Sequence, residues 1–506
     1  MNTEVQFKVL LANPATRVSL DANYERFFIK AGSRWPWTFV KRKDQKNTAC
    51  VFPHFLAYTA SILQDRGHHV EVIDGVALDL DDAEFLQKTE EINPGIVVIE
   101  TATHSITYDL KLCDEIKNRL PKTKIVLTGA HVTTFAEDIL RKNIAVDFCV
   151  MGEYEFVVAM IVDTLSKGDN IDKSVNGLAY RSGEKLIVSK QKSFITDINT
   201  LPGPAFDLFP CNSSPNIKIY GDGVCTYFPA ITLHASRGCP FRCDFCMWNT
   251  VMYGNGKYRT FHFMRVVDEM ENAVNKYQIK EVWFDDDDFC INKKHVLDIC
   301  TEIKRRQLNI KWSVMGDAMA IDEEMMKEMA SAGCYFIKFG VESGSKQILK
   351  NIEKPLSPEK ATEVAQWGRK YNVFTHATFT FGLSGETHDT MRETLSLAKK
   401  IKFDTAQMSI ATPFPGTRFY DKLMQAGHLK QVDWDQFDGT NTCTVERPKL
   451  PAMEVEKFRK KAIRSIVIKK AQDPIWWLRY LRRNYILYKN YGLSKVLEPI
   501  SAFFRL

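Results

Sequence analysis

Residues 235–249 read ASRGCPFRCDFCMWN and place Cys239, Cys243 and Cys246 at C-x3-C-x2-C spacing. The stretch follows the apolar, β-prone segment 231–233, so the three thiols are expected on a loop at the end of a strand. A [4Fe–4S] cluster is normally held by four thiolates, and three thiolates leave one iron open to another ligand. A structural zinc site is the alternative. It needs a fourth protein ligand nearby, and the nearest cysteines and histidines stand at none of the usual spacings.

The cysteine motif, with Phe245 before its last cysteine, resembles the signature of the radical S-adenosylmethionine (SAM) enzymes. In that family the open iron is chelated by the amino and carboxylate groups of SAM. The resemblance implies a [4Fe–4S] cluster on Cys239, Cys243 and Cys246, a bound SAM, and an external electron donor such as ferredoxin or flavodoxin. It also implies cleavage of SAM to a 5′-deoxyadenosyl radical, which takes hydrogen from an unactivated carbon.

Short apolar runs alternate with helical stretches ahead of the cysteine loop, from FKVLLANP at 7–14 to VDFCVMGE at 146–153. This alternation predicts a doubly wound α/β domain, with helices near 53–67, 108–120 and 134–142. Ligands of such a domain lie at the carboxyl ends of its strands. The loops expected there carry Thr101, Thr103, Gly129, His131, Thr133, Gly152 and Glu153.

The loops GAHVTT at 129–134 and MGEYE at 151–155 resemble those of the cobalamin-binding domain that precedes the radical SAM domain in one branch of the family. The resemblance implies that the seven loop residues just named contact cobalamin. The motif Asp-x-His-x-x-Gly, which supplies a histidine to cobalt in other cobalamin proteins, is absent from the sequence, so no histidine ligand is expected. The alternative is a bare Rossmann-like domain in which His131 only caps the following helix.

Five further strand-and-helix units follow the cysteine loop, which makes six units with the strand before it. Six is the number in the partial barrel of radical SAM enzymes, whose active site lies at the C-terminal ends of the strands. Between the two α/β regions, residues 166–225 contain an expected hairpin around Ser182 and a proline-rich stretch, LPGPAFDLFP. Prolines oppose regular structure, so this stretch is expected to be a linker.

The expected strand ends in the barrel offer polar side chains to SAM. By resemblance to the family, Asp285, Asp286 and Asp287 face its ammonium group, and Glu342 and Ser343 lie near its ribose. The alternative for the aspartates is a solvated loop or a helix N-terminus. The alternative at this strand end is a helix N-cap by Ser343 or Ser345, and capping and SAM binding can both be true.

The composition of the 506 residues, 45% hydrophobic and 26% charged, is that of a soluble globular protein of two or three domains. No leader-like segment and no run of eighteen apolar residues occurs in the sequence. The twelve cysteines are therefore expected to be reduced thiols in the cytoplasm rather than a disulfide framework.

The last 56 residues are strongly basic. Residues 451–506 hold thirteen Lys and Arg against four Asp and Glu, a net +9, whereas the whole chain carries +6 and the preceding 450 residues therefore −3. On a helix, Trp477, Leu478, Leu481, Tyr485 and Tyr488 form one stripe, with the basic residues outside it. Aromatic residues with a basic polar face are typical of an interfacial helix, so 474–506 is expected to contact a membrane surface from the cytoplasmic side.

Two alternatives remain for this tail. In the first, the stripe packs on the barrel and the basic residues form a solvated face. Nucleic acid is a weaker competitor, because no recognised RNA-binding module accompanies the charge.

We therefore predict an α/β chain with four parts: a Rossmann-like cobalamin-binding domain at 1–165, a hairpin and linker at 166–225, a partial (β/α)6 radical SAM barrel at 226–440, and a basic helical domain at 441–506. The expected activity is cobalamin-dependent methyl transfer to an unactivated carbon of a small-molecule or lipid-like substrate. The first alternative is radical oxidative cyclisation or ring rearrangement. The second is a non-catalytic cobalamin or redox sensor.

Overall fold

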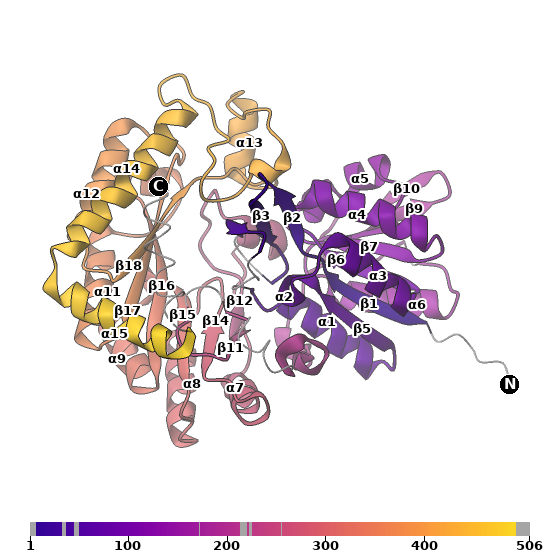
Figure 1. Cartoon of the computed structure of the whole chain (residues 1–506), viewed down its shortest axis with the longest axis horizontal. Coiled ribbons are helices and arrows are strands. Elements are labelled where there is room, and N and C mark those ends of the chain that lie inside the picture. Colours follow the sequence, from indigo (N-terminus) through magenta and orange to yellow (C-terminus); the bar gives the residue numbers. More distant parts are fainter. Residues whose placement is uncertain are drawn as a thin grey trace.

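The computed structural model of the chain describes residues 7–32, 37–44, 50–171, 173–212, 220–221, 225–254 and 256–491. Figure 1 shows an N-terminal α/β domain beside a second α/β domain, whose outer side carries the C-terminal helices. One hydrophobic core runs through both domains, and a second covers the other face of the N-terminal sheet. No helix in the described ranges has both the length and the hydropathy needed to cross a membrane.

The N-terminal domain is built on a seven-stranded sheet in the order β10-β9-β8-β7-β6-β1-β5. The strands β5, β1, β6, β7 and β8 are parallel, as predicted. Their continuous apolar runs are buried because helices cover both faces of the sheet. The strand bounds are Lys8–Asn13 (β1), His69–Asp74 (β5), Ile96–Glu100 (β6), Lys124–Thr128 (β7), Phe148–Val150 (β8), Leu178–Ser182 (β9) and Lys185–Val188 (β10).

Helices connect these parallel strands and lie close to the predicted ranges. They are α1 (His54–Asp65), α2 (Gly75–Leu78), α3 (Asp82–Ile92), α4 (Ile106–Arg119), α5 (Ala130–Lys142) and α6 (Glu155–Ser166). The predicted hairpin also forms, as β9 and β10, which pair antiparallel. Because β9 pairs in turn with β8, the hairpin extends the N-terminal sheet.

A small antiparallel sheet, absent from the sequence prediction, is inserted after β1. It consists of β2 (Thr16–Ser19), β3 (Tyr24–Ile29) and β4 (Trp37–Arg42), with Thr16 opposite Phe28. Phe27 and Phe28 are fully buried and fasten it to the domain. The insertion brings Lys30, directly after β3, to the carboxyl edge of the main sheet.

The second domain contains six parallel strands in the order β11-β14-β15-β16-β17-β18, which confirms the predicted partial barrel. The strand bounds are Ala230–Leu233 (β11), Glu281–Phe284 (β14), Lys311–Asp317 (β15), Cys334–Glu342 (β16), Phe374–Phe381 (β17) and Thr405–Ile410 (β18). The helices are α7 (Phe263–Tyr277), α8 (Lys293–Arg305), α9 (Glu323–Ser331), α10 (Lys346–Asn351), α11 (Pro358–Lys370), α12 (His388–Lys400) and α13 (Arg418–Gln425).

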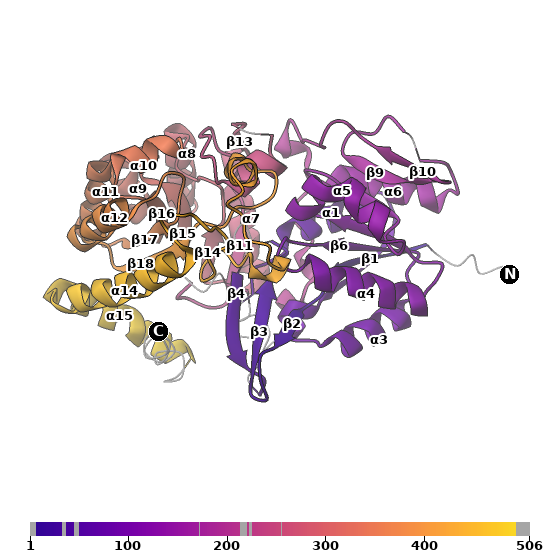
Figure 2. The ribbon, with the colours of Figure 1, turned by 90° about the horizontal axis from the view of Figure 1, so that it is seen from above.

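Two helices end the described chain, α14 (Ala452–Ala471) and α15 (Pro474–Tyr491). The first packs against β18 and α12. Figure 2 shows both helices along the lower side of the second domain in that view. The remainder of the predicted interfacial segment, 492–506, lies outside the described residues.

Candidate functional site

The cysteine loop follows β11, and backbone pairing holds its two ends together. A two-residue strand on its near side, β12 (Ser236–Arg237), pairs antiparallel with β13 (Arg259–Thr260) on its far side. Between the pairing and the first cysteine, Gly238 adopts φ = +85°, and a Cβ there would collide with the carbonyl oxygen of Lys257. Only glycine fits such a left-handed, crowded position without strain.

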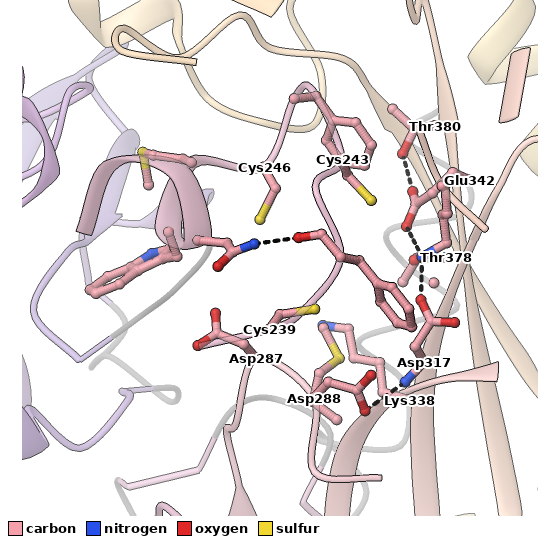
Figure 3. Close-up of a pocket in the computed structure, with 18 of the residues that line it drawn as sticks. Cys239, Cys243, Cys246, Asp287, Asp288, Asp317, Lys338, Glu342, Thr378 and Thr380 are labelled. Carbon is pink, nitrogen blue, oxygen red and sulfur yellow. Dashed lines mark hydrogen bonds and ion pairs between the residues drawn. The ribbon is translucent and has the colours of Figure 1, made fainter. Parts of the chain in front are cut away.

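The three thiols point into one cavity of about 1290 Å³, measured with its open mouth (Figure 3). None of them is in a disulfide. Burial raises the pKa of Cys243 to about 12 and that of Cys239 further, so metal binding is what would deprotonate these thiols. Within the described residues, no group of three or more His, Cys, Asp or Glu side chains is arranged to hold a single metal ion.

The four consecutive aspartates after β14 have different roles. Asp286 is buried and accepts hydrogen bonds from the backbone N–H of Ala235 (3.1 Å) and from the N–H and hydroxyl of Ser236, so it holds the start of the cysteine loop. Asp287 accepts from the N–H of Gly238 at 2.8 Å and also lines the cavity. Asp285 lines it too, whereas Asp286 does not.

Glu342 lies at the cavity wall in a strained conformation. Its φ is +62°, beside a register shift between β16 and β17, and its carboxylate accepts a hydrogen bond from Thr380 at 2.8 Å. A non-glycine residue held in the left-handed region is typical of functional sites. Its neighbour Ser343 is fully buried, lies 3.0 Å from the hydroxyl of Thr394, and does not reach the cavity.

A buried lysine of the cavity wall was missed by the sequence prediction. The ammonium of Lys354 lies 2.6 Å from Asp317 and 3.9 Å from Glu342. Burial alone would lower the pKa of Lys354, but these two carboxylates outweigh burial and the pKa is raised, so the cation persists. Nearby, burial and the charge of Asp317 raise the pKa of Asp288 to about 8. Lysines are frequent in solvated positions, and only the fold shows that this one is buried at the site.

Asp244, inside the cysteine motif, was also missed. Its buried carboxylate accepts from the hydroxyl of Ser384 and pairs with Lys422, both at 3.0 Å. Its backbone N–H donates to Ile352. These contacts tie the loop to the ends of β17 and α10 and to α13, which fixes the thiols relative to the barrel.

A second, smaller cavity of about 350 Å³ lies at the carboxyl edge of the N-terminal sheet. Thr101 and Thr103 line it, as do Lys30 and His104. Lys30 is fully buried and paired with Asp109, so the insertion after β1 supplies a charge that sequence reasoning did not place here. Three residues, Met247, Trp248 and Phe414, line both cavities, so ligands in the two cavities would be separated by these side chains alone.

The other loop residues predicted at this edge serve the fold in this structure. Gly129 has φ = +110°, where a Cβ would collide with the carbonyl oxygen of Thr101. The hydroxyl of Thr133 donates to Gly129 and accepts from the N–H of Gly152. The ring of His131 packs on Phe135 and Trp434, outside the cavity lining.

Glu153 lies in a buried ion cluster between the two domains. Its carboxylate pairs with Arg237 at 3.1 Å and with Arg259 at 2.7 Å, and accepts from the N–H of Ile195. Arg237 pairs in addition with Glu155 at 2.7 Å. In this structure Glu153 therefore joins the cysteine loop to the N-terminal domain and does not line the second cavity.

Comparison with known proteins gives a family match for the domain that carries the three cysteines and for the N-terminal domain. The family model of the radical SAM superfamily matches residues 233–398, and that of the B12 binding domain matches residues 48–161. An uncharacterised methyltransferase from Pyrococcus horikoshii is 32% identical over 82% of this chain and 86% of its own length. The chain belongs to the radical SAM enzymes with a B12-binding domain. Membership in this enzyme family sets aside the non-catalytic sensor.

Other relatives of this radical SAM enzyme differ in named activity. The anaerobic magnesium-protoporphyrin IX monomethyl ester cyclase of Cereibacter sphaeroides is 28% identical over 73% of this chain and 60% of its own length. The methyltransferase TsrM of Kitasatospora setae, solved with cobalamin and a [4Fe–4S] cluster bound, superposes with a TM-score of 0.68. It is 16% identical, covering 92% of this chain and 89% of that one, so this likeness is one of fold.

The cofactors of this radical SAM enzyme are those predicted from the sequence: a [4Fe–4S] cluster, SAM and cobalamin. The residues present fit them. Three converging thiols suit a cluster that keeps one iron open to another ligand. At the edge of the N-terminal sheet, the hydroxyl of Thr128 and Nδ1 of His104 are buried without a hydrogen-bond partner, as expected where a polar ligand is to bind.

Proposed function

We propose that the enzyme transfers a methyl group to an unactivated carbon of a small-molecule substrate. The observation that carries this proposal is the shared wall of Met247, Trp248 and Phe414, because it separates a SAM site from a cobalamin site by single side chains. When bound, the cluster with SAM supplies a 5′-deoxyadenosyl radical and cobalamin supplies a methyl group. A substrate at this wall is within reach of both.

Residues of the larger cavity would orient SAM. Asp285 and Asp287 offer carboxylates to its ammonium, and Lys354 offers a cation to its carboxylate. Glu342, held by Thr380, offers an acceptor to the ribose hydroxyls. Asp286 and Ser343 would act indirectly, by holding the loop and the strand end in place.

At the second cavity Thr101 and Thr103 would contact cobalamin, and Gly129 would let the backbone turn beneath them. His131 packs against aromatic rings, and burial lowers its pKa to about 3. We infer that His131 stays neutral and off the cobalt. Electron paramagnetic resonance of the cobalt(II) form should then show no nitrogen splitting, and clear splitting would contradict the assignment.

The residues that line the larger cavity would also keep water away from the radical and position the substrate. Phe241, Phe245 and Trp248 are apolar and exclude water, while Gln407 and Ser409 offer hydrogen bonds to a substrate. Exclusion of water is the protein's main contribution to such chemistry. An external reductant such as ferredoxin or flavodoxin would deliver the electron to the cluster.

Oxidative cyclisation is the second candidate, favoured by the relative from Cereibacter sphaeroides that is named as a cyclase. Products distinguish the two. Anaerobic, reduced enzyme is incubated with SAM carrying a deuterated methyl group and with fractionated cell extract. Methyl transfer to carbon should give a deuterium-labelled product with S-adenosylhomocysteine and 5′-deoxyadenosine in about equal amounts. An unlabelled product formed with 5′-deoxyadenosine alone would replace the proposal by cyclisation.

A further inference from the structure

The last described helix, α15, turns two arginines toward the barrel beside half-buried Trp476 and Tyr480. A helix on the surface of a soluble protein turns its apolar side inward. In α15 two arginines face the barrel. Arg479 pairs with Asp404 and donates to the carbonyl of Val373 at 2.8 Å. Arg483 donates to Thr226 at 3.2 Å and lies over the ring of Phe374.

The opposite side of α15 is apolar and exposed. It consists of six side chains, each 43–71% exposed, which we call the α15 face: Ile475, Trp477, Leu478, Leu481, Tyr485 and Tyr488. The stripe predicted from the sequence is part of this face, so the alternative that it packs on the barrel is wrong. Figure 2 shows α15 along the lower side of the second domain in that view, running back from the outer end of α14.

Exposed cations lie on both C-terminal helices. Of the described side chains on α14 and α15, the exposed charged ones are seven cations and a single carboxylate, Glu454. The cations are Lys457, Lys460, Lys461, Arg464, Lys469, Arg482 and Lys489. On α15 itself, Arg482 and Lys489 border the apolar row on one side. Near the end of α14, Val467 and Ile468 are also exposed apolar residues, and Lys469 follows them.

We propose that the α15 face and the exposed cations of both helices dock the enzyme on an anionic phospholipid membrane. Tryptophan and tyrosine prefer the membrane–water interface, and lysine and arginine beside them bind anionic headgroups. A second copy of the chain fits less well, because it would place two cationic surfaces against each other. Nucleic acid fits less well because the centre of the face, at Leu478 and Leu481, is apolar. Docking is independent of the proposed methyl transfer.

The test is sedimentation of the full-length holoenzyme with vesicles of phosphatidylglycerol and phosphatidylcholine, beside vesicles of phosphatidylcholine alone. We expect at least about tenfold tighter binding to the anionic vesicles, and weaker binding as salt is added. Point substitutions are preferable to truncation, because α15 covers Asp404 and Phe374. They replace exposed side chains, so the fold should persist.

Two variants probe the two parts of the surface. The double substitution Leu478→Ser with Leu481→Ser should weaken binding by roughly tenfold or more, since it removes the apolar centre. The triple substitution Lys469→Gln, Arg482→Gln and Lys489→Gln should weaken it by roughly fivefold per cation. The matched control replaces exposed apolar residues elsewhere, Ile144→Ser with Met424→Ser, and should bind like the unaltered enzyme.

Three outcomes would overturn the proposal. The first is no binding of the unaltered enzyme to anionic vesicles. The second is equal binding by the Leu478 and Leu481 variant. The third is a dimer in analytical ultracentrifugation that this same variant abolishes, since the face would then be an interface between copies of the chain. None of these measurements requires SAM cleavage, so their failure is distinguishable from failure of the proposed function.

Discussion

Replacing Cys239, Cys243 or Cys246 by alanine should reduce the iron content of anaerobically reconstituted protein to background and abolish SAM cleavage. The three thiols point into one cavity, and the described residues that line it include no further cysteine and no histidine (Figure 3). Loss of any one therefore leaves too few ligands for the cluster. Outer-shell partners of metal ligands are worth about 10- to 100-fold, so loss of a ligand should cost more than about 100-fold in 5′-deoxyadenosine formation.

Iron analysis and product quantification test this expectation together. Because the thiols act as one unit, the triple variant should be no worse than each single one. The control is Cys300→Ala, a buried cysteine on α8 outside the loop, which should keep its iron. Zinc in place of iron, or a triple variant that still forms 5′-deoxyadenosine, would contradict the assignment.

Replacing Arg237 by methionine should lower the free energy of unfolding by about 3–5 kcal/mol. Arg237 is fully buried between the domains, and it pairs with Glu153 and Glu155. Without Arg237, Glu155 has no cation beside it among the described residues, and Glu153 keeps only Arg259. A buried charge without its partner destabilises a protein by more than the intact ion pair stabilises it. The control is Arg305→Met: the Arg305 side chain is 65% exposed and its partner Glu302 keeps the pair with Arg306, so the change should cost at most about 1 kcal/mol. Urea unfolding measures both.

The pH dependence of the variant follows from Glu155. Burial raises the pKa of Glu155, and Arg237 opposes this rise, so the substitution should raise it further. When a carboxyl group has a higher pKa in the folded protein than in the unfolded chain, the folded protein loses stability as the pH rises from the unfolded pKa through the folded pKa. The free energy of unfolding of the Arg237→Met variant should therefore be lower at about pH 8 than at about pH 5. The double variant Arg237→Met with Glu155→Gln should recover part of the loss, and a loss unaffected by either change would contradict the ion-cluster explanation.

The sequence predicted the elements well because they rest on local patterns. Continuous apolar runs marked both parallel sheets, and cysteine spacing marked the cluster loop. The antiparallel insertion at 16–42 was missed. Along Tyr24–Ile29, half-buried and buried residues alternate only over the first four positions, so the period of two expected for a strand was a weak signal. Lys30 was missed with it.

Roles within the site were less predictable because they depend on distant partners. Four successive aspartates look alike in the sequence, yet the turn of the loop directs Asp286 to the backbone of Ala235 and Asp287 to the cavity. Glu153 was expected at a ligand, but it meets Arg237, which lies 84 residues along the chain. The helical period located the stripe on α15, whereas the side that faces the barrel is set by Arg479 and Asp404.

The central claim is that this enzyme uses the methyl group of SAM as well as its adenosyl group. The most direct test needs no substrate: reduced protein loaded with cluster and cobalamin is given SAM, and S-adenosylhomocysteine is quantified against bound cobalamin. We predict a burst of about one equivalent per cobalamin, absent from cobalamin-free protein. Formation of 5′-deoxyadenosine without any S-adenosylhomocysteine from the loaded protein would contradict the claim and assign the enzyme to cyclisation or rearrangement.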